Sequence, residues 1–94
     1  MTTDIGTPRD YSESKHLVYF EVYPTTIGKV KEIVQQRLGV DVLLIEQEFG
    51  ITCEIPIQII PEIIRELSIH NIAVYGVITT NLLERSNSIY NIKK

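Results

Sequence analysis

The chain lacks the features that mark several large classes of protein. Its 94 residues include a single cysteine, Cys53, which excludes an internal disulfide and a zinc site built from several cysteines. No apolar run approaches the roughly 18 residues of a membrane-spanning helix. The N-terminal segment MTTDIGTPRDYSES has no hydrophobic stretch, so we expect no signal peptide. A small domain without disulfides favours a reducing compartment, and we expect a cytoplasmic protein with no membrane partner.

Positive charge is also scarce. Nine basic residues stand against twelve acidic ones, which gives a net charge of −3. The only adjacent basic pair is Lys93 and Lys94, at the C-terminal end. Proteins that bind nucleic acids usually present a basic surface to the phosphates. We therefore expect no nucleic-acid partner.

What the chain does have is the patterning of one small domain with one core. Alternating apolar residues predict strands, and apolar residues at helical spacing predict helices. In order these are strand 16–24, helix 25–39, strands 40–47 and 48–55, a segment 56–71 that begins extended and becomes helical, and strand 72–79. Residues 1–14 are expected to be a disordered lead, 15–80 the folded domain and 81–94 a C-terminal tail.

The order β-α-β-β-α-β in so short a chain predicts an α+β fold, the ferredoxin-like sandwich. Its four-stranded sheet would be antiparallel with strand order 4-1-3-2, and both helices would cover one face. Strand 40–47 then lies at a sheet edge. Val42 and Leu44 occupy one face of this strand, and Leu43 and Ile45 the other. Only one pair can lie under the helices, so the other pair leaves apolar surface uncovered.

The outer face of the sheet, away from the helices, is predicted to carry tyrosines and aliphatic residues, which is typical of an interface. The residues expected to form it are Tyr19, Tyr23, Leu43, Ile45, Tyr75 and Val77. Contact with a second copy of the chain is the leading interpretation. In one alternative the C-terminal tail folds back over this face. In another the face is simply exposed, because aromatic pairs also stabilise open sheets.

Residues able to do chemistry are few. His16 and His70 lie far apart and lack a third ligand, so we expect no metal and no cofactor. Cys53 lies on the apolar face of its strand, where a buried, unreactive thiol is expected. Glu21 and Glu54 are interpreted as cross-strand neighbours on the outer face. Paired carboxylates can do acid–base work, but solvated surface charges are the simpler interpretation, and no catalytic residue is assigned.

One turn has a physical reason to bind a ligand. In the stretch YPTTIG, residues 23–28, a strand ends and a helix begins. Unpaired first-turn amides and the positive end of the helix dipole favour an anion, and threonine hydroxyls add donors. A small anionic effector is therefore predicted to bind at Thr25, Thr26, Ile27 and Gly28. The plainer alternative is that Thr25 or Thr26 only caps the helix.

Residues 18–78 resemble the ACT-type regulatory domains. Pro24, Ile27 and Val30 match the turn and helix pattern of that family, and the GVDV stretch at 39–42 matches the start of its second strand. The resemblance implies a ferredoxin-like module that binds a small effector, usually across an oligomer interface.

Two departures from the family pattern concern the ligand. Val22 stands where the family has an aspartate, and Thr25 where it has a glycine. The resemblance thus implies the fold and an oligomerising habit more than a particular effector. Other ferredoxin-like functions need a CxxC loop (copper chaperones), an arginine in the first turn (acylphosphatases) or a basic, aromatic third strand (RNA-recognition modules). The chain shows none of these patterns.

Together these observations favour a non-catalytic, homo-oligomeric regulatory or protein-interaction domain. The outer face and strand 40–47 would form the contact. An alternative is a small enzyme of the dimeric α/β-barrel kind, with a cavity between two outer faces lined by Tyr19, Glu21, Tyr23, Glu54 and Tyr75. A third is an adaptor whose partner is a different protein. An enzyme is the less favoured interpretation.

Overall fold

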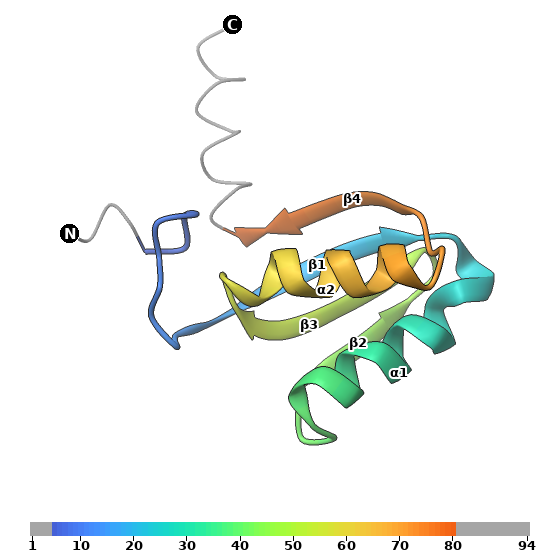
Figure 1. Ribbon diagram of the computed structural model, residues 1–94, viewed down its shortest axis with the longest axis horizontal. Coiled ribbons are helices and arrows are strands. Elements are labelled where there is room, and N and C mark those ends of the chain that lie inside the picture. Colours follow the sequence, from blue (N-terminus) through green and yellow to red (C-terminus); the bar gives the residue numbers. More distant parts are fainter. Residues whose placement is uncertain (1–4, 81–94) are drawn as a thin grey trace, which may run out of the picture.

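Two helices cover one face of a four-stranded antiparallel sheet in the computed structural model, which describes residues 5–80 (Figure 1). The elements are β1 (Lys15–Val22), a 3-10 turn (Pro24–Thr26), α1 (Ile27–Leu38), β2 (Leu44–Gln47), β3 (Gly50–Pro56), α2 (Ile59–Ile69) and β4 (Val74–Thr79). The strand order is β2-β3-β1-β4, which is 4-1-3-2 read from the other edge. The α+β class is confirmed, and the observed order agrees with the expected one. The prediction that the tail covers the sheet concerns residues 81–94, which lie outside the described residues.

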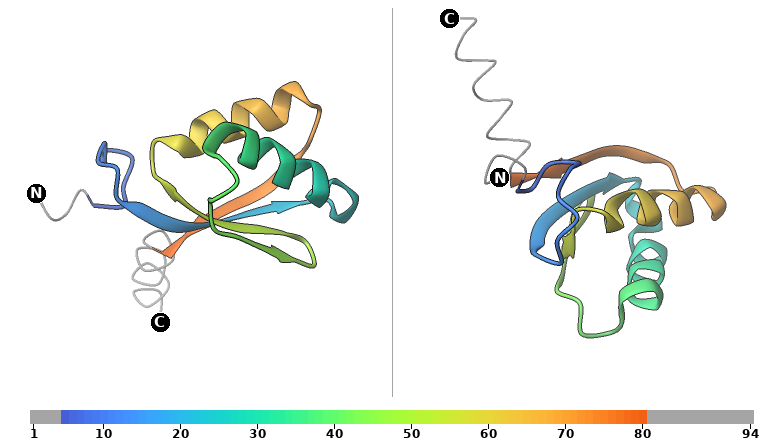
Figure 2. Two further views of the ribbon diagram at one scale, coloured as in Figure 1. Left: turned by 90° about the horizontal axis from the view of Figure 1, so that it is seen from below. Right: turned by 60° about the vertical axis from the view of Figure 1, so that its left-hand side comes forward.

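Both helices lie on the same side of the sheet, as two further views show (Figure 2). Alternation along β1 turns Val18, Phe20 and Val22 toward the helices, and all three are buried. Val18 pairs with Cys53 and Phe20 with Ile51, so β1 and β3 together form the floor of the core. The helices contribute Ile27, Val30, Ile33, Val34, Ile63 and Leu67. Helical spacing predicts a buried stripe of Ile60, Ile63, Ile64 and Leu67 in α2, and of these Ile63 and Leu67 are buried while Ile60 and Ile64 are partly buried.

The ends of both helices follow the expected chemistry. Gly39 has a φ of +98° and donates its N–H to the carbonyl of Gln35 at 2.7 Å, which ends α1. Asn71 has a φ of +61° after α2. Glycine and asparagine are the residues that adopt positive φ at least cost, so both stops were readable from the sequence.

Strand β2 is shorter than predicted. It begins at Leu44, and residues 40–42 form a turn and a bend instead of continuing the strand. The turn follows directly from the positive φ of Gly39, which redirects the chain after α1. Leu43 still accepts a hydrogen bond from the Glu54 amide at 3.1 Å. The expected division of faces holds, because Val42 and Leu44 pack against the core while Leu43 and Ile45 are each 48% exposed.

A β-bulge interrupts the pairing of β4 with β1. Glu21 lies opposite Gly76, but the next residue, Val22, lies opposite Val74. Tyr75 is therefore an extra residue between two pairs, and a bulge of this kind shifts the alternation of side chains by one position.

The shift corrects one predicted interface residue. Val77 lies opposite Phe20 and packs against the core, so its predicted place on the outer face is wrong. Ile78 lies opposite Tyr19 and is 38% exposed on the outer face instead. Simple alternation from the start of the strand gave the opposite assignment because it took no account of the bulge.

The segment before β1 has a defined conformation from residue 5 onward. Asp10 is 6% exposed and accepts hydrogen bonds from the backbone amides of Gly6 (2.8 Å) and Ser12 (2.9 Å). The Gln58 side-chain amide donates to the carbonyl oxygens of Pro8 (2.7 Å) and Asp10 (3.2 Å). This part of the expected disordered lead is thus joined to the start of α2.

Candidate functional site

The outer face of the sheet consists of cross-strand rows set by the register. One row runs Ile45, Thr52, Tyr19, Ile78 from β2 to β4. Leu17 and Leu43 lie beside it toward the start of β1, where Leu17 pairs with Glu54. The aliphatic side chains of these positions are 38–48% exposed. No helix of the described residues covers them (Figure 2).

The next row toward the end of β1 contains two glycines. Glu21 lies opposite Gly50 of β3 on one side and Gly76 of β4 on the other. The space above Gly50 is filled by the ring of Tyr19. The space above Gly76 is open enough that an added β-carbon would meet nothing nearer than the Glu21 Oε1 atom at 3.8 Å. The missing side chain of Gly76 therefore leaves a hollow beside the Glu21 carboxylate.

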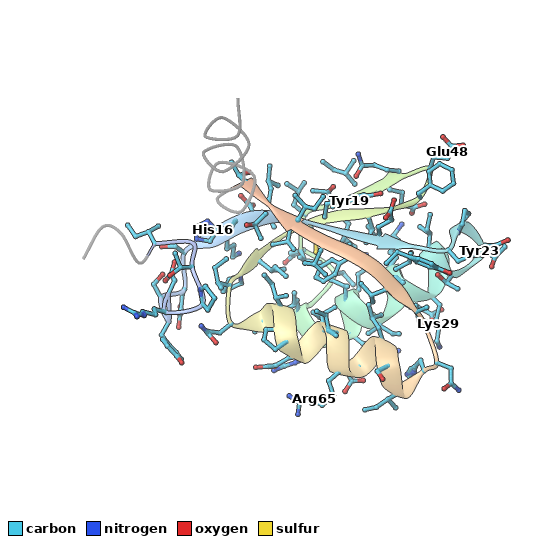
Figure 3. The ribbon with its side chains drawn as sticks, turned by 90° about the horizontal axis from the view of Figure 1, so that it is seen from above. His16, Tyr19, Tyr23, Lys29, Glu48 and Arg65 are labelled. Carbon is cyan, nitrogen blue, oxygen red and sulfur yellow. The ribbon has the colours of Figure 1, made fainter. Side chains whose placement is uncertain are left out.

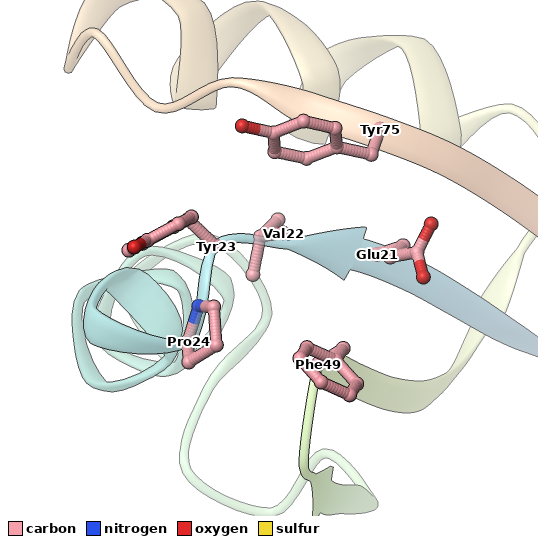
Figure 4. Close-up of a pocket in the computed structure, with 6 residues that line it drawn as sticks. All are labelled: Glu21, Val22, Tyr23, Pro24, Phe49 and Tyr75. Atoms are coloured by element: carbon pink, nitrogen blue, oxygen red, sulfur yellow. The ribbon is translucent and has the colours of Figure 1, made fainter.

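Glu21, which borders this hollow, also lines a pocket of about 310 Å³ at the end of the outer face, together with Val22, Tyr23, Pro24, Phe49 and Tyr75. Figure 4 shows the Tyr75 and Phe49 rings on opposite sides of β1, with Tyr23 and Pro24 at one end and the Glu21 carboxylate at the other.

Three different parts of the chain supply the rings. Tyr23 directly follows β1, Phe49 lies in the β2–β3 turn and Tyr75 is the bulge residue of β4. A hydrogen bond from the Val22 amide to the Phe49 carbonyl, at 2.9 Å, joins the turn to the end of β1. The three rings are 59%, 50% and 66% exposed, respectively. Exposed aromatic rings from distant segments thus line one pocket together with a single carboxylate.

The charge of the pocket is negative and has no counter-ion within the described residues. Glu21 carries the only carboxyl group among its lining residues. The ion pairs between residues 5 and 80 lie elsewhere: Asp10 with His16, Lys29 with Glu32, Lys31 with Glu46 and Arg37 with Glu62. The pocket therefore offers a negative group and aromatic faces.

Most of the predicted interface residues fall into two groups, one on the apolar part of the outer face and one in the pocket. Leu43 and Ile45 lie on the apolar part of the outer face beside Tyr19, which is partly buried. Tyr23 and Tyr75 line the pocket instead. Phe49, Gly50 and Gly76 were missed by sequence reasoning. The sequence feature that could have indicated them is the pair of glycines inside strands, because such glycines often mark a place where a ligand or another backbone approaches closely.

The predicted anion site is not assembled as expected. A 3-10 turn precedes α1, so the amides of Thr26 and Ile27 already donate to the carbonyls of Tyr23 and Pro24. The Thr26 hydroxyl also donates to the Tyr23 carbonyl, at 2.7 Å, and neither Thr25 nor Thr26 caps α1 through its side chain. The capping prediction is wrong for this reason. Ile27 is buried and Gly28 is exposed. The anion site stays a prediction, and two of its expected donors, the amides of Thr26 and Ile27, already donate within the 3-10 turn.

The supposed carboxylate pair is not a pair. Glu54 lies opposite Leu17, whereas Glu21 lies opposite Gly50, so the two carboxylates are four positions apart along β1. At about 3.3 Å per residue that places them roughly 13 Å apart. The alternative of a small enzyme therefore loses the neighbouring carboxylates on which its acid–base chemistry depended.

The remaining chemical groups also lie apart. His16 begins β1, while His70 follows α2 near Val74, the partner of Val22 at the other end of β1. Figure 3 shows His16 at the opposite end of the sheet from Tyr23. His16 Nε2 lies 3.4 Å from Asp10 Oδ2. Burial raises the pKa of the Cys53 thiol to about 12, which disfavours the thiolate, the reactive form.

Within residues 5–80 no three side chains of the metal-binding types come together. Neither α1 nor α2 has the length and apolar character needed to cross a membrane. Comparison of the chain with protein-family models, curated proteins and solved structures gave no match.

Proposed function

We propose that the chain is a non-catalytic protein-interaction domain of ferredoxin-like topology that pairs with a second copy through the outer face of its sheet. The observation that supports this is the apolar row on that face. Ile45, Tyr19 and Ile78 lie on three of the four strands, with Thr52 of β3 between Ile45 and Tyr19, and Leu17 and Leu43 lie beside them. A regulatory role through a bound effector, which the ACT-type resemblance implies, remains a further part of the proposal.

The energetics are compatible with a reversible dimer. Four aliphatic side chains on this face are 38–48% exposed in the single chain. Covering the exposed half of a Leu or Ile side chain contributes about 1 kcal/mol, so two copies would gain about 8 kcal/mol from these residues. Association itself costs about 4–15 kcal/mol. The difference is at best about 4 kcal/mol, which corresponds to a dissociation constant of about 1 mM from these four residues alone, so the other contacts of the face must supply the rest of the affinity.

The test is the solution mass by light scattering at high micromolar concentration, for the full chain and for the double variant Leu43→Glu, Ile45→Glu. A matched control, Val40→Glu, Ile69→Glu, adds the same charge at two exposed aliphatic positions outside this face, 80% and 64% exposed. Circular dichroism checks that each variant folds. The proposal expects a dimer or larger for the parent and the control, and a folded monomer for the double variant.

A monomeric parent, or a double variant that keeps the dimer mass, would overturn the proposal. Removal of residues 81–94 distinguishes the alternative in which the tail covers this face, because the shortened chain would then dimerise while the parent does not. An adaptor for a different protein would remain monomeric in all of these forms.

A further inference from the structure

We propose that the pocket formed by Glu21, Tyr23, Phe49 and Tyr75 binds a small quaternary ammonium ion. The proposal goes beyond self-association and does not depend on it, because the pocket lies at the end of the outer face and is complete within one chain. A quaternary ammonium ion carries a positive charge inside a shell of methyl groups, and each feature of the pocket corresponds to one part of that structure.

The aromatic rings can contact both parts of the ligand, since their faces attract its positive charge and their apolar surface packs against its methyl groups. The face of an aromatic ring attracts a cation, and several rings around one site are the usual means of recognising quaternary ammonium groups. Here three exposed rings from separate segments surround a single pocket, and Pro24 adds an apolar wall (Figure 4). Exposed rings that served only to fill the core would lie on the other side of the sheet, where Phe20 is fully buried.

The carboxylate sets the sign of the ligand. Glu21 is exposed, and no basic side chain of the described residues pairs with it. A negative group at the edge of an apolar pocket attracts a cation and repels an anion at short range. The pocket thus selects the opposite charge from the one predicted for the neighbouring turn at residues 25–28.

The separation of the hydrogen-bond acceptors distinguishes a quaternary ammonium ion from a primary amine. A primary ammonium group has three N–H donors, and leaving them unpaired on removal from water is costly. The lining side chains supply one carboxylate and two tyrosine hydroxyls, but Figure 4 shows both hydroxyls pointing away from the Glu21 carboxylate, so these acceptors do not converge on one ammonium group. A quaternary ion has no donor to satisfy. The pocket volume of about 310 Å³ also lies at the small end of the range for ligand pockets.

Three probes separate charge from methylation, and two of them, choline and 3,3-dimethyl-1-butanol, have nearly the same shape. Choline carries both, ethanolamine has the charge without the methyl groups, and 3,3-dimethyl-1-butanol has the methyl groups without the charge. Each is titrated into ¹⁵N-labelled full-length chain while the backbone amide shifts are followed. We expect choline to shift the amides of Tyr23, Phe49 and Tyr75, and to bind at least about 5-fold more tightly than either other probe.

Variants test whether the named groups are responsible. Glu21→Gln keeps the shape of the side chain but removes its charge, and Tyr75→Leu removes a ring from an exposed position; both are expected to weaken choline binding by at least about 3-fold. Glu48→Gln is the matched control, since Glu48 lies in the same turn as Phe49 but does not line the pocket (Figure 3). It is expected to leave choline binding unchanged.

Three results would overturn the proposal. Equal binding of choline and the neutral alcohol would mean that charge is not recognised. The absence of saturable shifts at tens of millimolar choline would mean that there is no site. Equal weakening by Glu21→Gln and Glu48→Gln would mean that only net charge matters. Titration of the Leu43→Glu, Ile45→Glu variant keeps this test separate from self-association, because its pocket residues are intact and choline binding is expected to persist.

Discussion

The ring of Tyr19 lies over Gly50 of the neighbouring strand, with its Cε1 atom 2.8 Å from the position that a β-carbon on Gly50 would occupy. A glycine inside a strand leaves backbone uncovered, and an aromatic ring from the next strand can cover that gap. The same added β-carbon would also collide with the carbonyl oxygen of Phe20. The outer face is therefore closely packed at Gly50 and hollow on the other side of Glu21, at Gly76.

Gly50→Ala is expected to destabilise the domain by about 2 kcal/mol, because both the Tyr19 ring and the β1 backbone at Phe20 must move. The free energy of unfolding from urea titration measures this. Gly28→Ala is the matched control. Gly28 lies in the first turn of α1 and an added β-carbon there meets nothing within 4 Å, so that change is expected to stabilise by about 0.5–1 kcal/mol. Equal stability of the two variants would show that the close approach at Gly50 is not real.

Gly76→Ala is expected to leave folding almost unchanged and to weaken choline binding. The added β-carbon would lie 3.8 Å from Glu21 Oε1, an ordinary contact distance, so no neighbour has to move. It would, however, occupy part of the hollow beside the carboxylate. We expect a loss of about 2- to 5-fold in affinity, comparable to one exposed cation–ring contact. Unchanged affinity in the same amide-shift titration would place the ligand away from Gly76.

Acid should loosen the segment before β1. Hydrogen bonds from the Gly6 amide and then from Ser12 lower the pKa of Asp10 from 3.8 to about 2. Because the folded value lies below the unfolded one, the stabilisation is fully present above pH 3.8 and is lost as the pH falls toward 2. The Gly6 and Ser12 amide shifts, followed from pH 5 to pH 2, should titrate with a midpoint near 2. A midpoint near 3.8 would contradict the hydrogen bonds, and Asp10→Asn should abolish the transition.

Cys53 should not react with a thiol reagent at neutral pH in the folded chain. Burial raises the pKa of its thiol to about 12, and the side chain is fully buried. Reaction with an aromatic disulfide, followed by absorbance, should therefore occur only as fast as the chain unfolds and should become complete in denaturant. Rapid reaction in buffer alone would mean that β3 opens readily.

The sequence predicted those features that depend on local patterns. The stripe of α1 that includes Val30 and Val34 and the inward face of β1 follow from spacing alone, since each position is decided by its own periodicity. The positive φ of Gly39 and Asn71 likewise follows from residue type. The order of elements that follows from these features predicted the α+β class correctly, and the strand order expected from it agrees with the observed one.

The candidate site was beyond such reasoning because it depends on register. Whether Glu21 lies between Gly50 and Gly76 or beside Glu54 is decided by how three strands align, and alternation within one strand carries no information about that. The bulge at Tyr75 also cannot be inferred from alternation within β4, and it turns Val77 toward the core instead of the outer face. The 3-10 turn at Pro24–Thr26 replaced the expected threonine cap, since its backbone hydrogen bonds use the amides first.

The two hydrogen bonds from Gln58 to the Pro8 and Asp10 carbonyls have a practical consequence for handling the protein. They hold the segment before β1 against the start of α2, beside His16 and at the far end of the sheet from Tyr23 (Figure 3). A biotin or a fluorescent dye coupled near Ile5 would therefore be attached to a segment that hydrogen bonds hold against α2, far from the aromatic pocket. A chip coated through that position would present the pocket to the flowing solution.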